Sequence, residues 1–312
     1  MIMQHRNLGN TGISVSEVAF GGVSIGMPYA EQPKPSEQLS INLLHTALDK
    51  GINYFDTARM YGDSESLLGK AFHDRRNKVI INTKCIHLLD EHGRIPQNIN
   101  IPKTIASSLD QSLKTLKTDY IDVYMLHQSS PDILKNEEVM RTFSDLRDSG
   151  KVRTIGASTY TLEESKICID SGVWQVIQVP FNLMDQQQRN IFSLARERGV
   201  GLIIRSVLFR GFLTGKVMEL PEPLKAVESH IRRFNSLTND PVSLAMKFIL
   251  SYPEVSSMLV GIDQMHHLTK AVEVADRKYF EGEFLGNLEG MAYPDPSFLN
   301  FSHWVKSGWL KN

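Results

Sequence analysis

The chain has 312 residues with 34 basic and 35 acidic side chains, so its formal net charge is −1. Its composition, 41% hydrophobic and 22% charged, is that of a globular protein and excludes a disordered chain. The near balance of charge also removes the electrostatic attraction to phosphate backbones that nucleic-acid binding needs.

Membrane, targeting and cross-linking signals are missing from the sequence. No apolar run approaches the roughly 20 residues that span a bilayer. The N-terminal segment Met1–Asn7 lacks the apolar core of a signal peptide. The two cysteines, Cys85 and Cys168, are too few for a disulfide framework. We therefore expect a cytoplasmic protein with no membrane or nucleic-acid partner.

The predicted elements alternate in type along the chain. Runs rich in β-branched residues predict strands at Glu17–Phe20, Ile52–Asp56, Val79–Thr83, Ile121–Leu126, Thr154–Ser158, Val176–Val179, Val200–Ser206 and Ser257–Gly261. Amphipathic spacing predicts helices at Gln38–Lys50, Glu65–Phe72, Thr104–Leu116, Glu138–Ser149, Leu162–Asp170, Gln188–Arg198, Val242–Ser251 and Met265–Ala275. Glycines follow several of these helices, where a left-handed C-cap favours them, at Gly51, Gly150, Gly172 and Gly199.

Eight strand–helix units predict an α/β fold, a (β/α)8 TIM barrel, because parallel strands joined by crossovers close at this number. An open doubly wound sheet alternates in the same way. No Gly-x-Gly-x-x-Gly follows a predicted strand, however, and no change in composition divides the chain. We therefore predict a single barrel domain over residues 1–312. The Thr11-Gly12 turn within Leu8–Val15 predicts a short N-terminal hairpin at the bottom of the barrel.

Ionisable side chains lie at the ends of three consecutive predicted strands. Asp56 ends one strand and Tyr61 lies in the loop behind it, Lys84 follows the next strand, and His127 follows the one after. Such barrels carry their chemistry at the C-terminal ends of the strands, so these four side chains are expected at one rim. Each has an ordinary structural explanation when taken alone. Packing does not require polar groups after three successive strands, and we therefore expect a catalytic site.

The chemistry of the four groups is coherent. A tyrosine is a poor proton donor and acceptor at neutral pH because its pKa is about 10. The Lys84 cation would stabilise the Tyr61 phenolate, and Asp56 would keep a buried Lys84 charged and oriented. His127 would hydrogen-bond a carbonyl oxygen. Together they predict a proton relay with Tyr61 as the general acid in carbonyl reduction and the general base in alcohol oxidation.

The same residues carry a resemblance to a known family. The block Phe55–Glu65 (Phe-Asp-Thr-Ala-Arg-Met-Tyr-Gly-Asp-Ser-Glu), then Thr83-Lys84 and Leu126-His127, resemble the signature blocks of the aldo-keto reductases. Gly156–Ser158 and Gly211–Lys216 follow in that family's order. The resemblance runs over nearly the whole chain. It implies the same barrel and an NAD(P)H-dependent interconversion of a carbonyl and an alcohol.

The resemblance also implies which residues bind the cofactor. These are Asp56, Ser158, Gln178, Arg205, Ser206, Leu208, Arg210, Gly211, Leu213, Gly261, Asp263 and His267. Ser158 and Gln178 match positions that hydrogen-bond the nicotinamide carboxamide, and the loop around Arg210 matches a segment over the pyrophosphate. Arg205 stands where the family usually has a tyrosine stacked on the nicotinamide, and a planar guanidinium can also stack. The alternative for Arg205 is an outward-facing basic residue.

The choice between NADP(H) and NAD(H) is open in the sequence. NADP(H) is the family default, with basic residues after the last strand that bind the 2′-phosphate. Here His267 occupies the approximate arginine position, and Lys270 and Ala271 replace a Glu-Asn pair. The Asp263 carboxylate would repel a 2′-phosphate and accept from a 2′-hydroxyl. NAD(H) is therefore a serious alternative, unless Asp263 faces water and caps the following helix.

The sequence names a class of partner but not a substrate. We expect a small-molecule carbonyl or sugar, bound by loops at Pro28–Ser36, His87–Gln97, Ser129–Glu137 and Lys216–Asn239 and by the C-terminal tail. That tail is aromatic, and most of its rings are expected to pin it to the barrel: Tyr293, Phe298, Phe301, Trp304 and Trp309. No metal is expected, because the adjacent His266 and His267 lack further ligands at suitable spacing. A cofactor-binding regulatory subunit or redox sensor is the alternative function.

Overall fold

Eight parallel strands close into a barrel in the computed structural model, which describes residues 3–29, 32–216 and 219–310. Around the barrel the strand order is β10-β3-β4-β5-β6-β7-β8-β9. The strands are β3 (Val18–Gly21), β4 (Tyr54–Asp56), β5 (Ile80–Lys84), β6 (Ile121–Leu126), β7 (Val152–Ser158), β8 (Val176–Pro180), β9 (Gly201–Arg205) and β10 (Val255–Gly261). Every predicted strand overlaps one of them, so the predicted (β/α)8 barrel is confirmed.

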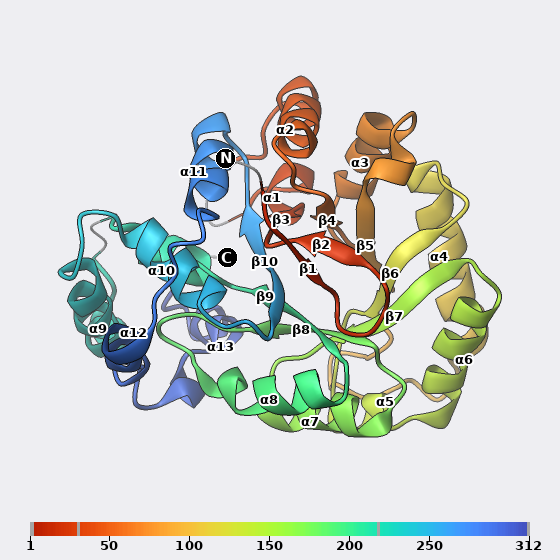
Figure 1. The fold of residues 1–312 in the computed structure, drawn as a ribbon. Helices are drawn as coiled ribbons and strands as arrows, with labels where there is room; N and C mark the ends of the chain where they lie inside the picture. Colours follow the sequence, from red (N-terminus) through yellow and green to blue (C-terminus); the bar gives the residue numbers. More distant parts are fainter. Residues whose placement is uncertain (1–2, 30–31, 217–218, 311–312) are drawn as a thin grey trace.

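Helices surround the strands (Figure 1). They are α1 (Val23–Gly26), α2 (Glu37–Asp49), α3 (Ser64–Phe72), α4 (Ile101–Leu116), α5 (Pro131–Leu134), α6 (Glu137–Asp148), α7 (Leu162–Ser171), α8 (Phe192–Glu197), α9 (Lys225–Asn235), α10 (Pro241–Leu250), α11 (Met265–Val274), α12 (Gly282–Glu289) and α13 (Phe301–Lys306). Short 3-10 turns lie at η1 (Arg76–Lys78), η2 (Gln187–Ile191), η3 (Phe209–Thr214), η4 (Glu222–Leu224) and η5 (Pro296–Phe298). No helix in the described part of the chain combines the length and apolar composition needed to cross a membrane.

The predicted N-terminal hairpin is also confirmed. Strands β1 (His5–Asn7) and β2 (Ser14–Ser16) pair antiparallel, and the hairpin lies across the barrel in Figure 1. Leu8 and Ile13 of its turn are buried in one cluster with Val123 and Ile203 from inside the barrel. Gly9 has a φ of +52°, and a Cβ there would lie 2.3 Å from the Gly199 carbonyl oxygen. The hairpin therefore closes the end of the barrel at which the strands begin.

One predicted loop contains a helix. Within 216–239, expected as a substrate loop, the chain forms η4 and α9. Val227, Ile231 and Phe234 are buried along one face of α9, at the spacing of successive helical turns. Burial of this apolar face accounts for the helix. Residues 30–31 and 217–218, in two of the predicted pocket loops, lie outside the described residues.

The aromatic tail packs against the barrel, as expected. Trp304 on α13 is fully buried and donates its indole Nε1 to the Phe298 carbonyl oxygen at 2.8 Å. The Phe301 ring lies 4.7 Å from the ring of Phe209 in η3, centroid to centroid. The tail is thereby attached to the loop that follows β9.

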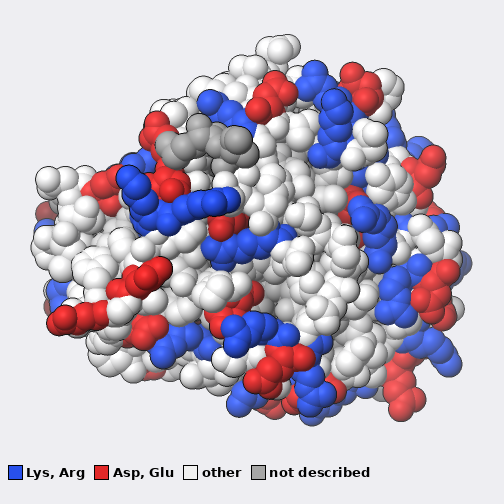
Figure 2. Space-filling model, in the orientation of Figure 1, with Lys and Arg blue, Asp and Glu red and all other residues white. Residues whose placement is uncertain are grey.

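The surface carries charges of both signs. On the face in Figure 2, basic and acidic side chains are interspersed over most of the outline. This distribution matches the net charge of −1. It gives that face none of the broad basic area that a nucleic-acid backbone requires.

Candidate active site

A buried ion pair lies at the C-terminal ends of β4 and β5. Lys84 is fully buried, and its Nζ donates to Asp56 Oδ1 at 2.7 Å, to Oδ2 at 2.8 Å and to the Thr57 carbonyl oxygen at 3.0 Å. Asp56 is 3% exposed. All three ammonium hydrogens thus have acceptors, which is the condition under which a buried charge is tolerated.

Two amide side chains complete the environment of the carboxylate. Asn82 on β5 and Gln178 on β8 both donate to Asp56 Oδ1, Gln178 through Nε2 at 2.8 Å. A carboxylate accepts hydrogen bonds only, so the orientation of both amides is fixed. The oxygen of each amide points elsewhere as a consequence.

Tyr61 lies over the ammonium group. The Lys84 Nζ is 4.8 Å from the centroid of the Tyr61 ring. The backbone of the Tyr61 loop is held by close contact with α1, because a Cβ on Gly26 would come within 1.9 Å of the Tyr61 carbonyl oxygen. The Asp63 N–H also donates to the Gly26 carbonyl oxygen at 3.1 Å. The backbone position of Tyr61 is therefore set in part by a glycine in the connection after the preceding strand, β3.

Burial keeps the Tyr61 phenol protonated. Burial and the Asp56 carboxylate raise the pKa of Tyr61 well above 10, and the Arg205 guanidinium opposes them. The expectation that a nearby cation governs this pKa therefore does not describe the isolated protein, in which desolvation is the larger effect. Burial also lowers the pKa of Lys84, while its pairing with Asp56 raises it. The phenol is a proton donor at neutral pH.

His127 is an uncharged partner of Tyr61. The two rings are 5.5 Å apart and nearly perpendicular. Burial, and then the Lys84 cation, lower the pKa of His127 to about 2. Its Nδ1 is buried and has no hydrogen-bond partner in the described structure. A bare acceptor is tolerated there more readily than an unsatisfied N–H, so the ring proton is expected on Nε2.

A donor and an acceptor lie side by side on β7 and β8. Ser158 and Gln178 are register partners at the C-terminal ends of these strands. Within the described residues, neither the Ser158 hydroxyl nor the Gln178 Oε1 has a hydrogen-bond partner. A primary amide needs one donor for its oxygen and one acceptor for its nitrogen. The pair therefore fits the carboxamide of a nicotinamide.

Arg205 ends β9 and faces the site. Its guanidinium lies 4.3 Å over the Tyr160 ring and donates from Nη2 to the Thr159 carbonyl oxygen at 2.9 Å. Its Nε is buried without a partner in the described structure, and its charge acts on Tyr61, Lys84 and His127. Arg205 is therefore not the outward-facing residue of the alternative interpretation. Ser206 follows it with a φ of +60°.

The loop after β9 has an unusual backbone. Phe209, Arg210 and Gly211 all have positive φ values. The N–H groups of Gly211 and Leu213 donate to the Leu208 carbonyl oxygen at 2.9 and 3.2 Å, so they are engaged within the loop. The Arg210 guanidinium lies over the rings of Tyr29 and Phe301, 5.6 and 5.2 Å from their centroids. These two N–H groups are therefore not available to a pyrophosphate, and the Arg210 charge is the contact that this loop could still offer.

The polar side chains after β10 already have carboxylate or imidazole partners. Gly261 ends the strand, and Asp263 accepts from His267 Nδ1 at 2.6 Å, which lowers the pKa of Asp263. Lys270 forms an ion pair with Asp240. Asp263 makes no side-chain cap on α11, whose N-cap residue is Gln264. Both basic groups that could meet a 2′-phosphate are thus already engaged by carboxylates.

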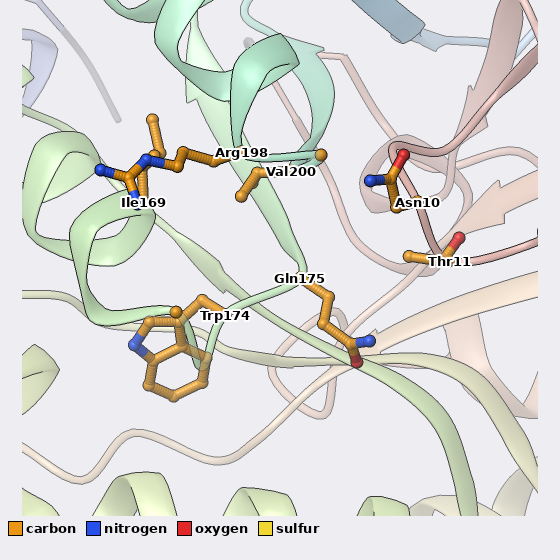
Figure 3. A pocket seen from close by; sticks show the side chains of 9 residues that line it. Asn10, Thr11, Ile169, Trp174, Gln175, Arg198 and Val200 are labelled. Carbon is orange, nitrogen blue, oxygen red and sulfur yellow. The ribbon is translucent and has the colours of Figure 1, made fainter.

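A cavity of about 300 Å³ lies at the opposite end of the barrel (Figure 3). Its lining comes from the hairpin turn at Asn10 and Thr11 and from the segments before β8 and β9, which include Trp174, Gln175 and Arg198. Residues at this end of such barrels contribute to stability, and the chemistry is at the other end. The cavity therefore lies outside the candidate active site.

Sequence reasoning did not assign three residues to the catalytic group, although His87 begins one of the predicted pocket loops. Asn82 contacts Asp56, the Tyr160 ring stacks on Arg205, and the His87 ring lies 4.9 Å from that of His127. Asn82 carried a usable signal, since residues two apart on a strand point to the same face and Asn82 precedes Lys84 by two. Tyr160 and His87 lie in loops, where no periodicity predicts direction.

Comparison with known proteins gives the family. The model described as "Aldo/keto reductase family" matches residues 17–290. The aldo-keto reductase YhdN of Bacillus subtilis is 32% identical over 223 residues, which cover 70% of this chain and 66% of YhdN. The NADH-specific methylglyoxal reductase of Escherichia coli is 29% identical over 246 residues, covering 74% of this chain and 76% of that protein.

The fold agrees with this relationship. The solved holo form of the aldo-keto reductase AKR11C1 from Bacillus halodurans superposes with a TM-score of 0.79 at 25% sequence identity, covering 93% of this chain and 96% of that one. The family consists of oxidoreductases that interconvert carbonyls and alcohols, generally with NAD(P)H. The chain described here belongs to the aldo-keto reductase family.

Proposed function

We propose that the protein is an NAD(P)H-dependent oxidoreductase that interconverts a small carbonyl compound, an aldehyde, ketone or sugar, and its alcohol. Tyr61 acts as the general acid in reduction and the general base in oxidation, with Asp56, Lys84 and His127 as its partners. Residues 1–312 act as a single barrel domain. The observation that carries the proposal is the buried Asp56–Lys84 pair beneath the Tyr61 ring.

The pair supplies what a tyrosine acid lacks. As the phenol gives its proton to a carbonyl oxygen, negative charge develops on Tyr61 in a site that burial has largely desolvated. Lys84 lies beneath the ring, and opposite charges about 5 Å apart interact by about 3 kcal/mol at an effective dielectric constant of about 20. The cation thus acts mainly on the transition state, where the phenolate forms. Asp56 holds that cation in place.

His127 orients the carbonyl oxygen. A neutral imidazole with its proton on Nε2 donates a hydrogen bond without competing for the proton that Tyr61 transfers. The pKa of about 2 supports this state at any ordinary pH. Tyr61 and His127 would then bind the same oxygen from two sides, because their rings are in contact and nearly perpendicular.

The cofactor residues fit a nicotinamide. The Ser158 hydroxyl and the Gln178 Oε1 would hold the carboxamide. Arg205, with Ser206 after it, would pack against the nicotinamide ring. Bound there, the reduced nicotinamide supplies the hydride. The loop that contains Leu208, Arg210, Gly211 and Leu213 would cover the pyrophosphate, with the Arg210 charge as its main attraction.

The residues expected near the 2′ position of the adenosine ribose favour NAD(H) more than the family default implies. His267 is hydrogen-bonded to Asp263 and Lys270 forms an ion pair with Asp240, so neither side chain is free for a phosphate. Asp263 and Gly261 would then bind a 2′-hydroxyl. The name of the Escherichia coli relative, an NADH-specific reductase, agrees with this direction. NADP(H) remains the family default and NAD(H) the alternative that these pairs support.

Titration and turnover test the proposal together. The intrinsic fluorescence of the protein would be followed during titration with NADPH and with NADH, and each cofactor would then be used with a panel of aldehydes, ketones and sugars. We expect saturable binding of at least one cofactor and its oxidation in the presence of a carbonyl. Binding without oxidation for every carbonyl and alcohol tried would favour the regulatory or sensor function instead.

A further inference from the structure

Asn82 is a polar residue inside the barrel that the proposed chemistry does not yet use. It is fully buried on β5, two residues before Lys84, and donates through Nδ2 to Asp56 Oδ1. Its own Oδ1 is buried and has no hydrogen-bond partner in the described structure. An unsatisfied buried carbonyl opposes folding. Packing alone therefore gives no reason for an asparagine at this position.

The surroundings of Asn82 are otherwise those of an apolar core. Its register partner on β6 is Val123, which belongs to a fully buried apolar cluster with Ala19 and Tyr54. An aliphatic side chain would fill the space without a polar atom to satisfy. What it could not do is donate a hydrogen bond to the carboxylate next to it.

The position of the Asp56 carboxylate matters because it offsets burial and the Arg205 charge, which both lower the pKa of Lys84. Asp56 faces Lys84 on β5 and the phenols of Tyr54 and Tyr61, and the Arg205 charge at the end of β9 acts on both Lys84 and Tyr61. Tyr160 acts on Lys84 from the loop after β7, and the neutral His127 lies beside Tyr61. Asp56 is the carboxylate that holds Lys84 charged. Its Oδ1 receives hydrogen bonds from Lys84, Gln178 and Asn82.

The three donors differ in what else they do. Lys84 is the cation beneath Tyr61, and Gln178 is proposed to contact the nicotinamide through its other amide atom. Asn82 lies behind both, with every polar atom buried. It is the donor that neither substrate nor cofactor can reach, so its contact with Asp56 is independent of both.

We propose that Asn82 is a positioning residue, which fixes the Asp56 carboxylate and thereby keeps Lys84 charged and placed beneath Tyr61. The inference rests on the proposed function, since it assumes that Tyr61 is the acid. It assigns Asn82 an effect on kcat and little effect on binding.

Two variants of Asn82 test this proposal, because the activity of one should depend on pH and that of the other should not. Asn82→Leu removes the donor at every pH, and kcat should fall about tenfold, the effect of losing one charge-assisted hydrogen bond, with KM changed less than about threefold. Asn82→Asp is isosteric, and two adjacent carboxyls share a proton. The protonated Asp would donate to Asp56 in place of the amide. Its kcat relative to wild type should therefore rise as pH falls, and that of Asn82→Leu should not.

A readout without substrate or cofactor accompanies the rates. The shared proton raises the folded-state pKa of the pair above its unfolded value, so it destabilises Asn82→Asp at high pH and less as pH falls. The unfolding midpoint in urea should approach that of wild type on acidification, while the deficit of Asn82→Leu stays constant. Ser112→Ala on α4 is the control, because it removes a buried unpartnered hydroxyl outside the barrel and should leave kcat and its pH profile unchanged.

The outcomes separate the two proposals. Recovery of both kcat and stability in Asn82→Asp at low pH supports the positioning role. Recovery of stability with a kcat that stays at the wild-type value in both variants overturns it, since Asn82 would then be structural. If Tyr61→Phe retains the wild-type kcat, the proposed function itself is wrong, and the role of Asn82 is overturned with it. If only the role of Asn82 is wrong, Tyr61→Phe should still be inactive.

Discussion

Gln178 on β8 donates its Nε2 to Asp56 Oδ1 on β4 at 2.8 Å, across the interior of the barrel. The two strands are opposite each other in the closed sheet. The hydrogen bond joins the residue proposed to hold the nicotinamide to the residue that is paired with Lys84, the lysine of the proposed relay. In the proposed mechanism, the position of the cofactor and the charge of the proton relay are therefore coupled through one side chain.

Lys84→Met should lower kcat about 100-fold, because the interaction of about 3 kcal/mol with the developing phenolate is lost. The pH profile of kcat should shift, since the ionisation of Tyr61 and of the lysine are coupled. Steady-state rates over a range of pH measure both effects. Lys103→Met, on the exposed surface of α4, is the control and should match wild type. An unshifted profile with retained activity would count against the role of Lys84.

His127→Gln should reduce kcat about tenfold and leave the limbs of the pH profile in place. The pKa of His127 is about 2, so its protonation does not produce either limb. The glutamine amide keeps a donor for the carbonyl oxygen but not the position of the imidazole. The rate of carbonyl reduction between about pH 5 and 9 is the measurement, well above that pKa. A limb that disappears in the variant would show that His127 titrates and that its neutral role is wrong.

Asp263→Ala should strengthen NADPH binding by about 1 kcal/mol, roughly fivefold, because it removes a carboxylate and frees His267. NADH binding should not improve, since it has no 2′-phosphate. Dissociation constants for both cofactors, measured by fluorescence in the variant and wild type, decide the point. Asp74→Ala, in the exposed turn after α3, changes the net charge equally and should have no effect. Either of two results would contradict the prediction: an unchanged NADPH affinity, or a wild-type preference for NADPH of several hundredfold.

Phe301→Ala should weaken cofactor binding about fivefold without changing the proton relay. Its ring packs on Phe209 and Phe212 of η3 and supports the Arg210 guanidinium. Loss of these contacts frees the loop proposed to cover the pyrophosphate. The dissociation constant and kcat at saturating cofactor are measured together. Phe284→Ala on α12, where the ring is largely exposed, is the matched control, and equal effects of the two variants would remove the link between tail and loop.

The sequence was enough to predict the barrel and the rim of the site. Alternating strands and helices repeated eight times leave few other folds, and Asp56 and Lys84 follow neighbouring strands, so their proximity follows from parallel pairing. The contact of Gln178 with Asp56 was beyond reach because it depends on closure of the sheet. The register of the strands sets that contact, and no local pattern encodes it.

Other features depend on competition between effects. Burial outweighs the nearby cations at Tyr61, so its pKa rises where charge pairing alone predicted a fall. Asp263 and His267 are four residues apart, the spacing of neighbours on a helix, but Asp263 precedes α11. Whether the Asp263 side chain meets His267 or caps the helix depends on the residue at which α11 begins. The helix α9 lies within the segment 216–239 that was predicted as a substrate loop.

The role of Tyr61 as the proton donor is tested most directly by single-turnover oxidation of bound cofactor in Tyr61→Phe. With a carbonyl substrate in excess, the rate should fall at least about 100-fold, while the cofactor dissociation constant stays within about twofold of wild type, because only the transferable proton is lost. Tyr120→Phe, before β6 at the opposite end of the barrel, should react at the wild-type rate. Oxidation of the cofactor at near wild-type rate in Tyr61→Phe would contradict the proposed relay.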